Sequence, residues 1–273
     1  MALDTSDQTR VRSARLRTLS GWGRRFAVPV LVIAGVLGVW QLVVVWRDIP
    51  DYLLPRPLQV WRAFAQSPST FMSNIGVTTW EIFLGLAIGI AGALVWAVLL
   101  VSFPPVRKAV YPLMVAAQSA PKEALAPVFI IWWGFSSLPK VVMAALICFF
   151  PMLVATVVGL ERFSEQQRLL AASIGASRLK TLFSFRVWTA LPSFLSGIRL
   201  GVTLAAIGAV LGEFLGSDKG VGYQILSASR RLDGGLLYAS LIALIVVSWV
   251  LVRIVDLSEA WLLRGVKRGR FVT

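Results

Sequence analysis

The sequence contains no histidine and only one cysteine among its 273 residues. The absence of histidine removes the usual general base and the commonest metal ligand of proteins. The single cysteine, Cys148, excludes an internal disulfide and a paired-thiol metal site, and its apolar neighbours favour a core position. The chain also lacks a G-x-x-x-x-G-K-S/T loop for binding a nucleotide. We therefore expect no catalytic residues, no metal site and no cofactor bound by this chain.

Charge is scarce as well, since 15% of the residues are charged and 57% are hydrophobic. This balance is far from that of a soluble domain and predicts a multi-pass protein of the lipid bilayer. The net charge of +14 would suit a nucleic-acid partner, but the lysines and arginines cluster in the tails and in one set of loops. That distribution follows the positive-inside rule, so we expect no nucleic-acid partner and both termini in the cytoplasm of a cell-membrane protein.

The apolar stretches predict an all-α integral membrane protein. Each is long enough to cross the hydrocarbon core as a helix. Between a cytoplasmic tail over 1–25 and a second tail over 257–273, we predict a transmembrane domain over 26–256 with six spans, at about 26–46, 77–101, 111–134, 141–160, 192–214 and 234–252. The segments 47–76 and 215–233 are expected as outer loops. Glycines spaced by four residues predict close helix packing at Gly85 and Gly89, and along the fifth span at Gly197, Gly201, Gly208 and Gly212.

The third predicted span is unusual because it carries charged residues and several prolines. Lys122 and Glu123 lie between two apolar halves, close to Pro121. Charges at membrane depth are costly and should face protein or water, and prolines break the helical hydrogen bonds where a cavity can accept the freed groups. Two interpretations remain open: a translocation path with Gln118, Lys122, Glu123 and Glu213 as candidates, or a Lys–Glu pair that only fixes helix packing. The position of Arg199 on the fifth span favours a side chain that snorkels to the headgroups over one that contacts the substrate.

The long charged interval 161–191 predicts two short helices around a glycine. Ser164 and Gln167 have the spacing of a capping box, and Gly175 is the residue type that ends a helix in the left-handed conformation. Ser177 is placed to cap the second helix. In that helix an apolar stripe recurs at three- and four-residue spacing, at Leu179, Leu182, Phe183 and Val187. The plain alternative is an amphipathic hairpin lying on the membrane with no partner.

This interval resembles the coupling loop of ATP-binding-cassette importer permeases. In the family pattern, which begins Glu-Ala-Ala, Ala171 and Gly175 occupy the third and seventh positions, and Gly175-Ala176-Ser177 matches the usual Gly-Ala-Ser. Leu169 stands where the family has its glutamate. The resemblance extends over about 52–249, beginning with a Leu-Leu-Pro-x-Pro segment at Leu53 and typical of the nitrate, sulfonate and taurine permeases. The segment from Gln118 to Pro127 is most similar to the branch for thiamine precursors and other nitrogen heterocycles.

The resemblance implies a type I importer permease fold, with a coupling loop that contacts the ATPase. The implied contact residues are Ala171, Gly175, Ala176, Ser177, Leu179, Leu182 and Phe183. The implied partners are a second permease copy, giving a homodimer, two ATP-binding-cassette ATPase subunits that bind ATP and Mg²⁺, and an extracytoplasmic solute-binding protein. The implied mechanism is alternating access. Two other classes stay open: a secondary transporter with Lys122, Glu123 and Glu213 as an ion relay, and a membrane protein without transport activity.

Overall fold

The computed structural model describes residues 27–268, and every regular element in that range is a helix. The predicted tail over 1–25 and residues 269–273 of the other tail lie outside the described residues. After a first helix at Ala27–Trp46, the elements in chain order are α2 (Pro57–Gln66), α3 (Pro68–Ser102), α4 (Pro104–Gln118), η1 (Lys122–Leu125), α5 (Ala126–Trp133), α6 (Leu138–Glu161), α7 (Glu165–Ser173), α8 (Arg178–Thr181), η2 (Leu182–Arg186), α9 (Val187–Gly216), α10 (Val221–Arg230) and α11 (Gly234–Arg268).

Five of the described helices are long and apolar enough to cross a membrane. They are Ala27–Trp46, Pro68–Ser102, Leu138–Glu161, Leu179–Gly216 and Gly234–Leu262. The first of them is almost entirely exposed, whereas half or more of the third and fourth is buried. The helix α3 begins at Pro68, ahead of its expected span over 77–101, and α11 continues to Arg268, beyond its expected span over 234–252.

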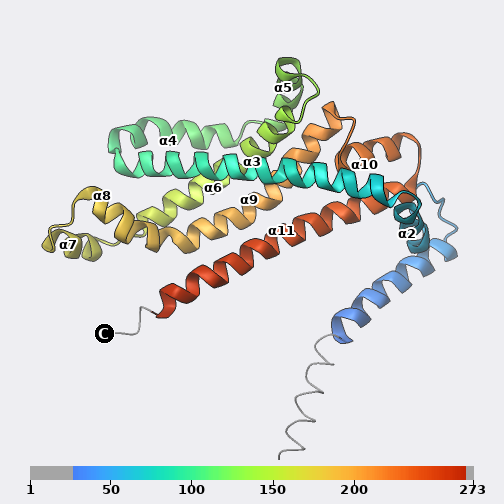
Figure 1. Ribbon diagram of the computed structural model, residues 1–273, viewed down its shortest axis with the longest axis horizontal. Coiled ribbons are helices and arrows are strands. Elements are labelled where there is room, and N and C mark those ends of the chain that lie inside the picture. Colours follow the sequence, from blue (N-terminus) through green and yellow to red (C-terminus); the bar gives the residue numbers. More distant parts are fainter. Residues whose placement is uncertain (1–26, 269–273) are drawn as a thin grey trace, which may run out of the picture.

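The predicted third span, 111–134, does not form one spanning helix. The chain instead forms α4, the short η1 turn and α5. The interruption lies at Pro121, which has no N–H to donate and whose ring excludes a continuing helix. The break itself follows from the proline content, but the single 111–134 span is a correction to the sequence prediction. Figure 1 shows α5 projecting from the bundle away from the axis of α4.

Two segments expected as outer loops are largely helical. In the first, α2 begins with Pro57, a residue favoured in the first helical turn, and Val60 packs with Phe71 and with the start of α11. In the second, α10 buries Val221 and Ala228 between α3, α9 and α11. Tertiary packing of an apolar face stabilises such ten-residue helices, which would be marginal alone.

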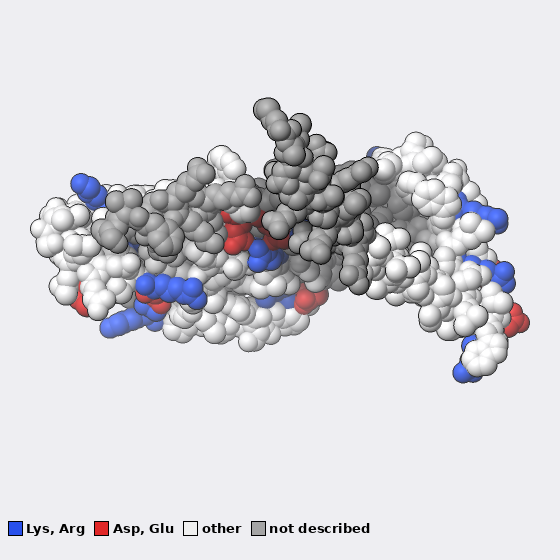
Figure 2. Space-filling model, turned by 90° about the horizontal axis from the view of Figure 1, so that it is seen from below, with Lys and Arg blue, Asp and Glu red and all other residues white. Residues whose placement is uncertain are grey.

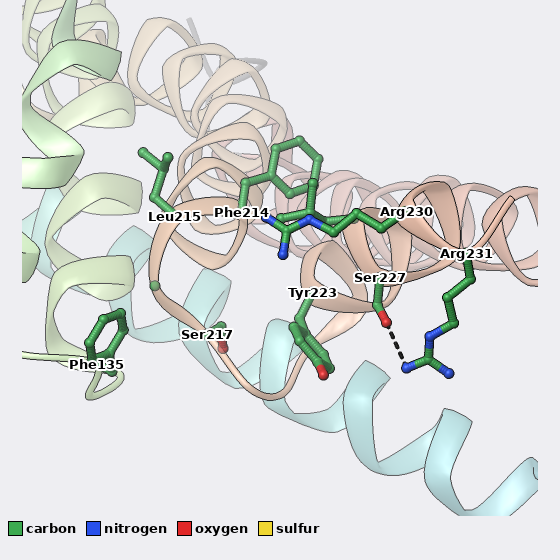
Figure 3. A pocket seen from close by; sticks show the side chains of 10 residues that line it. Phe135, Phe214, Leu215, Ser217, Tyr223, Ser227, Arg230 and Arg231 are labelled. Carbon is green, nitrogen blue, oxygen red and sulfur yellow. Dashed lines mark hydrogen bonds between the residues drawn. The ribbon is translucent and has the colours of Figure 1, made fainter.

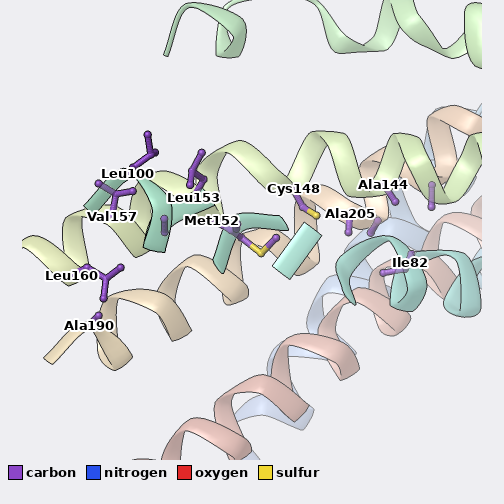
Figure 4. Close-up of a cluster of buried hydrophobic side chains, with 14 of the residues drawn as sticks. Ile82, Leu100, Ala144, Cys148, Met152, Leu153, Val157, Leu160, Ala190 and Ala205 are labelled. Carbon is purple, nitrogen blue, oxygen red and sulfur yellow. The ribbon is translucent and has the colours of Figure 1, made fainter. Parts of the chain in front are cut away.

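The core of the bundle is formed by α3, α6 and α9. Its buried side chains are small or flexible, and include Ile82, Ala144, Cys148, Met152 and Ala205 (Figure 4). Cys148 is therefore a core residue, as its surroundings predicted.

Glycines allow these helices to approach closely. A Cβ built on Gly208 would lie 2.6 Å from Cα of Ala144, and one on Gly197 would lie 2.9 Å from Cβ of Ala155. Gly85 likewise packs directly on Ala144. The predicted packing role of both glycine series is confirmed, with α6 as their shared partner.

The molecule is elongated, and its short helices lie at opposite ends. Figure 1 places α7 and α8 at one end of the α3–α6–α9 bundle and α2 and α10 at the other. The face shown in Figure 2 carries lysines and arginines at both ends. The same face also carries charged side chains of both signs near its middle.

Candidate functional site

The helix–glycine–helix segment is built by local hydrogen bonds. The backbone N–H of Gln167 donates to Oγ of Ser164 at 3.3 Å, and the N–H of Ser164 donates to Oε1 of Gln167 at 2.9 Å. These two bonds form the predicted capping box at the start of α7. At the second helix, the N–H of Lys180 donates to Oγ of Ser177 at 3.3 Å, so Ser177 caps it as predicted.

Gly175 ends α7 in the left-handed conformation, with φ of 65°, as predicted. Its N–H donates to the carbonyl of Ala172 at 3.0 Å, and the N–H of Ala176 donates to the carbonyl of Ala171 at 2.9 Å. This pair of bonds is a Schellman motif, which satisfies carbonyls that the helix end would leave free. The turn is therefore fixed by its own backbone.

The second helix of this segment is not a separate hairpin arm. It continues through α8 and the π-helical turn η2 directly into α9, so the segment and the fifth span form one rod. Leu182 is buried in the bundle core with Leu160 and Ala190, which corrects the sequence prediction that it faces outward with Leu179 and Phe183. The reason is that η2 widens the helix and turns Leu182 toward α6.

Five large apolar side chains are exposed on this segment. They are Leu169, Leu170, Ile174, Leu179 and Phe183, each at least 60% exposed. Ala171 of α7 is buried. Leu169 and Leu170 lie in α7, Ile174 is its C-cap, and Leu179 and Phe183 lie in α8 and η2, so all five are carried by the glycine turn and the two helices that flank it.

Lys122 and Glu123 do not pair with each other within the described residues. The Nζ of Lys122 donates to the carbonyl of Gln118 at 3.2 Å and lies 5.2 Å from the ring centroid of Phe150. Lys122 therefore caps the end of α4, where a cation is favoured. Glu123 is exposed in η1. The interpretation of these residues as a mutually satisfied packing pair is wrong, and the path interpretation stays a prediction.

Glu213 is completely buried and holds three elements together. One carboxylate oxygen accepts a hydrogen bond of 2.6 Å from Oγ1 of Thr78 in α3, and the other accepts one from the backbone N–H of Gly222 in α10. A side chain at Gly220 or Gly222 would collide with this carboxylate, so both positions require glycine. The geometry assigns Glu213 an internal structural contact.

A buried charge pair lies beside Glu213, and the sequence analysis did not predict this pair. The Nζ of Lys140 is 3.8 Å from Oε1 of Glu81, and both side chains are almost fully buried. Neither Glu81 oxygen has a hydrogen-bond partner in the part of the chain described. Lys140 lies just before the fourth predicted span, at about 141–160, but it belongs to α6 and packs against Gly212 of α9. The sequence signal for this pair is the presence of opposite charges near the ends of the second and fourth predicted spans.

Arg199 forms salt bridges with α11 rather than reaching the headgroups alone. Its Nε donates to Asp256 at 2.7 Å and its guanidinium donates to Glu259 at 2.6 Å. At the same end of the bundle, Arg107 of α4 pairs with Glu161 of α6 at 2.5 Å. Ion pairs therefore tie the outlying helices to the core, and the snorkelling interpretation of Arg199 is corrected to an interhelical contact.

At the opposite end, a cleft of about 290 Å³ runs along α10 (Figure 3). Phe135, Phe214 and Tyr223 supply aromatic surface, and Arg230 and Arg231 supply positive charge. Ser227 accepts a hydrogen bond of 2.9 Å from Arg231 across its rim.

Taken together, membrane-length helices around a small-residue core, with a capped apolar turn at one end and a lined cleft at the other, define a membrane transport subunit. The family model of the binding-protein-dependent transport system inner membrane component matches residues 85–268. The chain belongs to this family and is an ATP-binding-cassette importer permease, a non-enzymatic, multi-pass subunit with the type I importer permease fold.

Three relatives illustrate the family. The formylaminopyrimidine transport permease protein ThiX of Halalkalibacterium halodurans is 36% identical over 79% of this chain and 86% of its own. The riboflavin transport system permease protein RibX of Chloroflexus aurantiacus is 32% identical over 94% and 96%. The taurine transport system permease protein TauC of Escherichia coli is 24% identical over 89% and 90%.

Proposed function

We propose that two copies of this chain form the translocation path of an importer, and that two ATPase subunits drive alternating access by moving the α7–α8 segment. The observation that carries this proposal is the set of exposed apolar side chains on both sides of a rigid glycine turn, namely Leu169, Leu170, Ile174, Leu179 and Phe183. Single exposed apolar side chains are ordinary on a protein surface. Several of them gathered on one rigid turn mark an interaction site, and such a site suits a soluble partner. The rod continues into α9, so a displacement of the turn is transmitted to the bundle.

The proposed orientation places both termini and α7–α8 in the cytoplasm. The α2–α10 end then faces outward and receives solute from an extracytoplasmic binding protein. Supporting this arrangement, most lysines and arginines of the chain lie in the tails and in the interval 161–191.

We infer a small nitrogen heterocycle as the solute. The segment from Gln118 to Pro127 resembles the thiamine-precursor branch, and two relatives above 30% identity are named for a formylaminopyrimidine and for riboflavin. A third, a probable permease of Haemophilus influenzae at 34% identity, has a name that states no solute. The relative named for taurine is less similar, at 24% identity. Taurine-type solutes are therefore the second candidate within the same family.

The test is uptake into proteoliposomes that contain this permease, its ATPase and its binding protein. Uptake of a labelled formylaminopyrimidine should require ATP and all three proteins, namely the permease, the ATPase and the binding protein. Taurine serves as the matched probe, and a permease-only vesicle serves as the control. Uptake that proceeds without the ATPase would contradict the importer mechanism, whereas ATP-dependent uptake of taurine alone would change only the solute.

A further inference from the structure

A second cleft borders α10, between α2, α3 and the start of α11. It has a volume of about 290 Å³, close to the lower limit of about 300 Å³ for small-molecule sites. Tyr223, Ser227 and Arg231 line both this cleft and the one in Figure 3. The remainder of its wall is mainly amide and hydroxyl groups, from Gln66, Ser67, Thr70, Asn74 and Gln224.

Gln224 carries an unpaired group at this cleft. Its side chain is 8% exposed, and Oε1 has no hydrogen-bond partner among residues 27–268. A buried amide carbonyl without a partner costs free energy, and native proteins rarely retain one unless something else completes it. The neighbours Val221 and Ala228 on the same helix show that this region accepts apolar side chains. An amide here therefore calls for a hydrogen-bonding ligand.

The cleft wall is fixed before any ligand arrives. The backbone N–H of Gly220 donates to Oδ1 of Asn74 at 2.8 Å, and the N–H of Val221 donates to Oγ1 of Thr78 at 2.8 Å. These bonds anchor the start of α10 on α3, one turn before Gln224. A preorganised wall lowers the entropy lost when a ligand binds.

The charged groups of the cleft make bonds within the chain but keep capacity for a ligand. Arg231 donates one N–H to Ser227 at 2.9 Å, and Oδ1 of Asp233 accepts a bond of 3.0 Å from the N–H of Leu236. A guanidinium has further N–H donors and a carboxylate a second oxygen, so a ligand meets these charges as well as amides, hydroxyls and the half-buried ring of Tyr223. Amides recognise adjacent donors and acceptors, and an aromatic ring favours a flat ligand.

We propose that this cleft binds a planar nitrogen heterocycle, with the Gln224 side chain hydrogen-bonded to a donor on the ring edge. The inference rests on the proposed function, because it takes the transported solute as the occupant. The cleft would receive the solute at the outward end, before it enters the path.

The experiment measures equilibrium binding of a formylaminopyrimidine to the permease–ATPase complex in nanodiscs, without the binding protein and without ATP. Gln224→Leu keeps the side-chain size but removes the amide, and should weaken binding at least tenfold. Its thermal midpoint should stay equal or rise, because an unpaired buried carbonyl has gone. Gln41→Leu, a half-buried amide on the first helix that does not line the cleft, is the matched control and should bind normally.

Equal affinity in the wild type and in Gln224→Leu, or no pyrimidine binding by the wild type, would overturn the assignment. If Gln224→Leu does not assemble, Tyr223→Leu tests the stacking wall and should weaken binding severalfold. The uptake assay separates this inference from the proposed solute. If the pyrimidine is taken up but its binding does not depend on Gln224, the assignment of this cleft is wrong and the proposed solute stands. If taurine is taken up instead, while pyrimidine binding depends on Gln224, the proposed solute is wrong and the cleft still binds the heterocycle.

Discussion

The hydroxyl of Thr78 in α3 donates a hydrogen bond of 2.6 Å to the carboxylate of Glu213 in α9. The same oxygen accepts the backbone N–H of Val221, so Thr78 joins three helices at one atom. Both side chains are buried, at 0% and 1% exposure, so solvent does not reach either bond.

Thr78→Val should therefore destabilise the purified complex. Each buried group left without a partner costs about 1–3 kcal/mol, and this change orphans a carboxylate oxygen and a backbone N–H. The measurement is the thermal or denaturant midpoint in detergent. Thr79→Val is the control, because that hydroxyl bonds only to the carbonyl of Ile75 in its own helix. Equal midpoints for the two variants would contradict the network.

Lys140→Met should be more damaging than its small volume change suggests. It leaves Glu81 as an unpaired buried charge, and removing one member of such a pair costs about 3–5 kcal/mol. Adding Glu81→Gln should recover much of the loss, since the double variant leaves no unpaired charge at position 81. Lys108→Met on the exposed surface of α4 is the comparison. A double variant that is no more stable than Lys140→Met would contradict the buried Lys140–Glu81 pair.

Gly208→Ala should disrupt the packing of α9 on α6. The added carbon would lie 2.6 Å from Cα of Ala144 and 2.7 Å from the carbonyl oxygen of Met143, and backbone cannot yield as a flexible side chain can. Overpacking of this kind costs about 1–3 kcal/mol. Gly38→Ala in the first helix meets nothing within 4 Å and should be silent. Assembly yield and thermal midpoint compare the two.

Gly175→Val should impair coupling while leaving assembly intact. Nothing lies within 4 Å of the added carbon, so the change acts through the left-handed backbone, at about 1–2 kcal/mol. We expect normal size-exclusion behaviour and reduced stimulation of ATP hydrolysis by loaded binding protein. Ala172→Val, in the helical turn before it, is the control. Full stimulation in Gly175→Val would favour the partnerless surface hairpin.

The orientation is checked by cysteine labelling in a Cys148→Ala background. Cysteines introduced at Ser67 and Ser229 should react with an impermeant thiol reagent added outside intact cells. A cysteine at Ser177 should react only after permeabilisation. All three positions are exposed, so a lack of reaction reports the side of the membrane and not burial. The reversed pattern would place α7–α8 outside and exclude their contact with a cytoplasmic ATPase.

The sequence determined the features whose causes are local. Long charge-free runs make membrane helices, because backbone groups in lipid must bond within their own segment. Ser164, Gln167 and Gly175 dictate a capped helix and its left-handed end because their partners lie within a few residues. Pro121 likewise makes a break unavoidable, although its effect on the predicted third span was underestimated.

Only the tertiary structure decided which polar side chains meet. Thr78 and Glu213 are 135 residues apart, and no local pattern encodes their contact. The burial of Lys140 against Glu81 depends on how α6 crosses α3 and α9. Glycines of α3 and α9 pack directly on α6 and allow this close crossing. Leu182 is buried because Leu160 of α6 and Ala190 of α9 belong to the same core cluster. Periodicity states which residues share a helix face, but the neighbouring helix decides whether that face is buried.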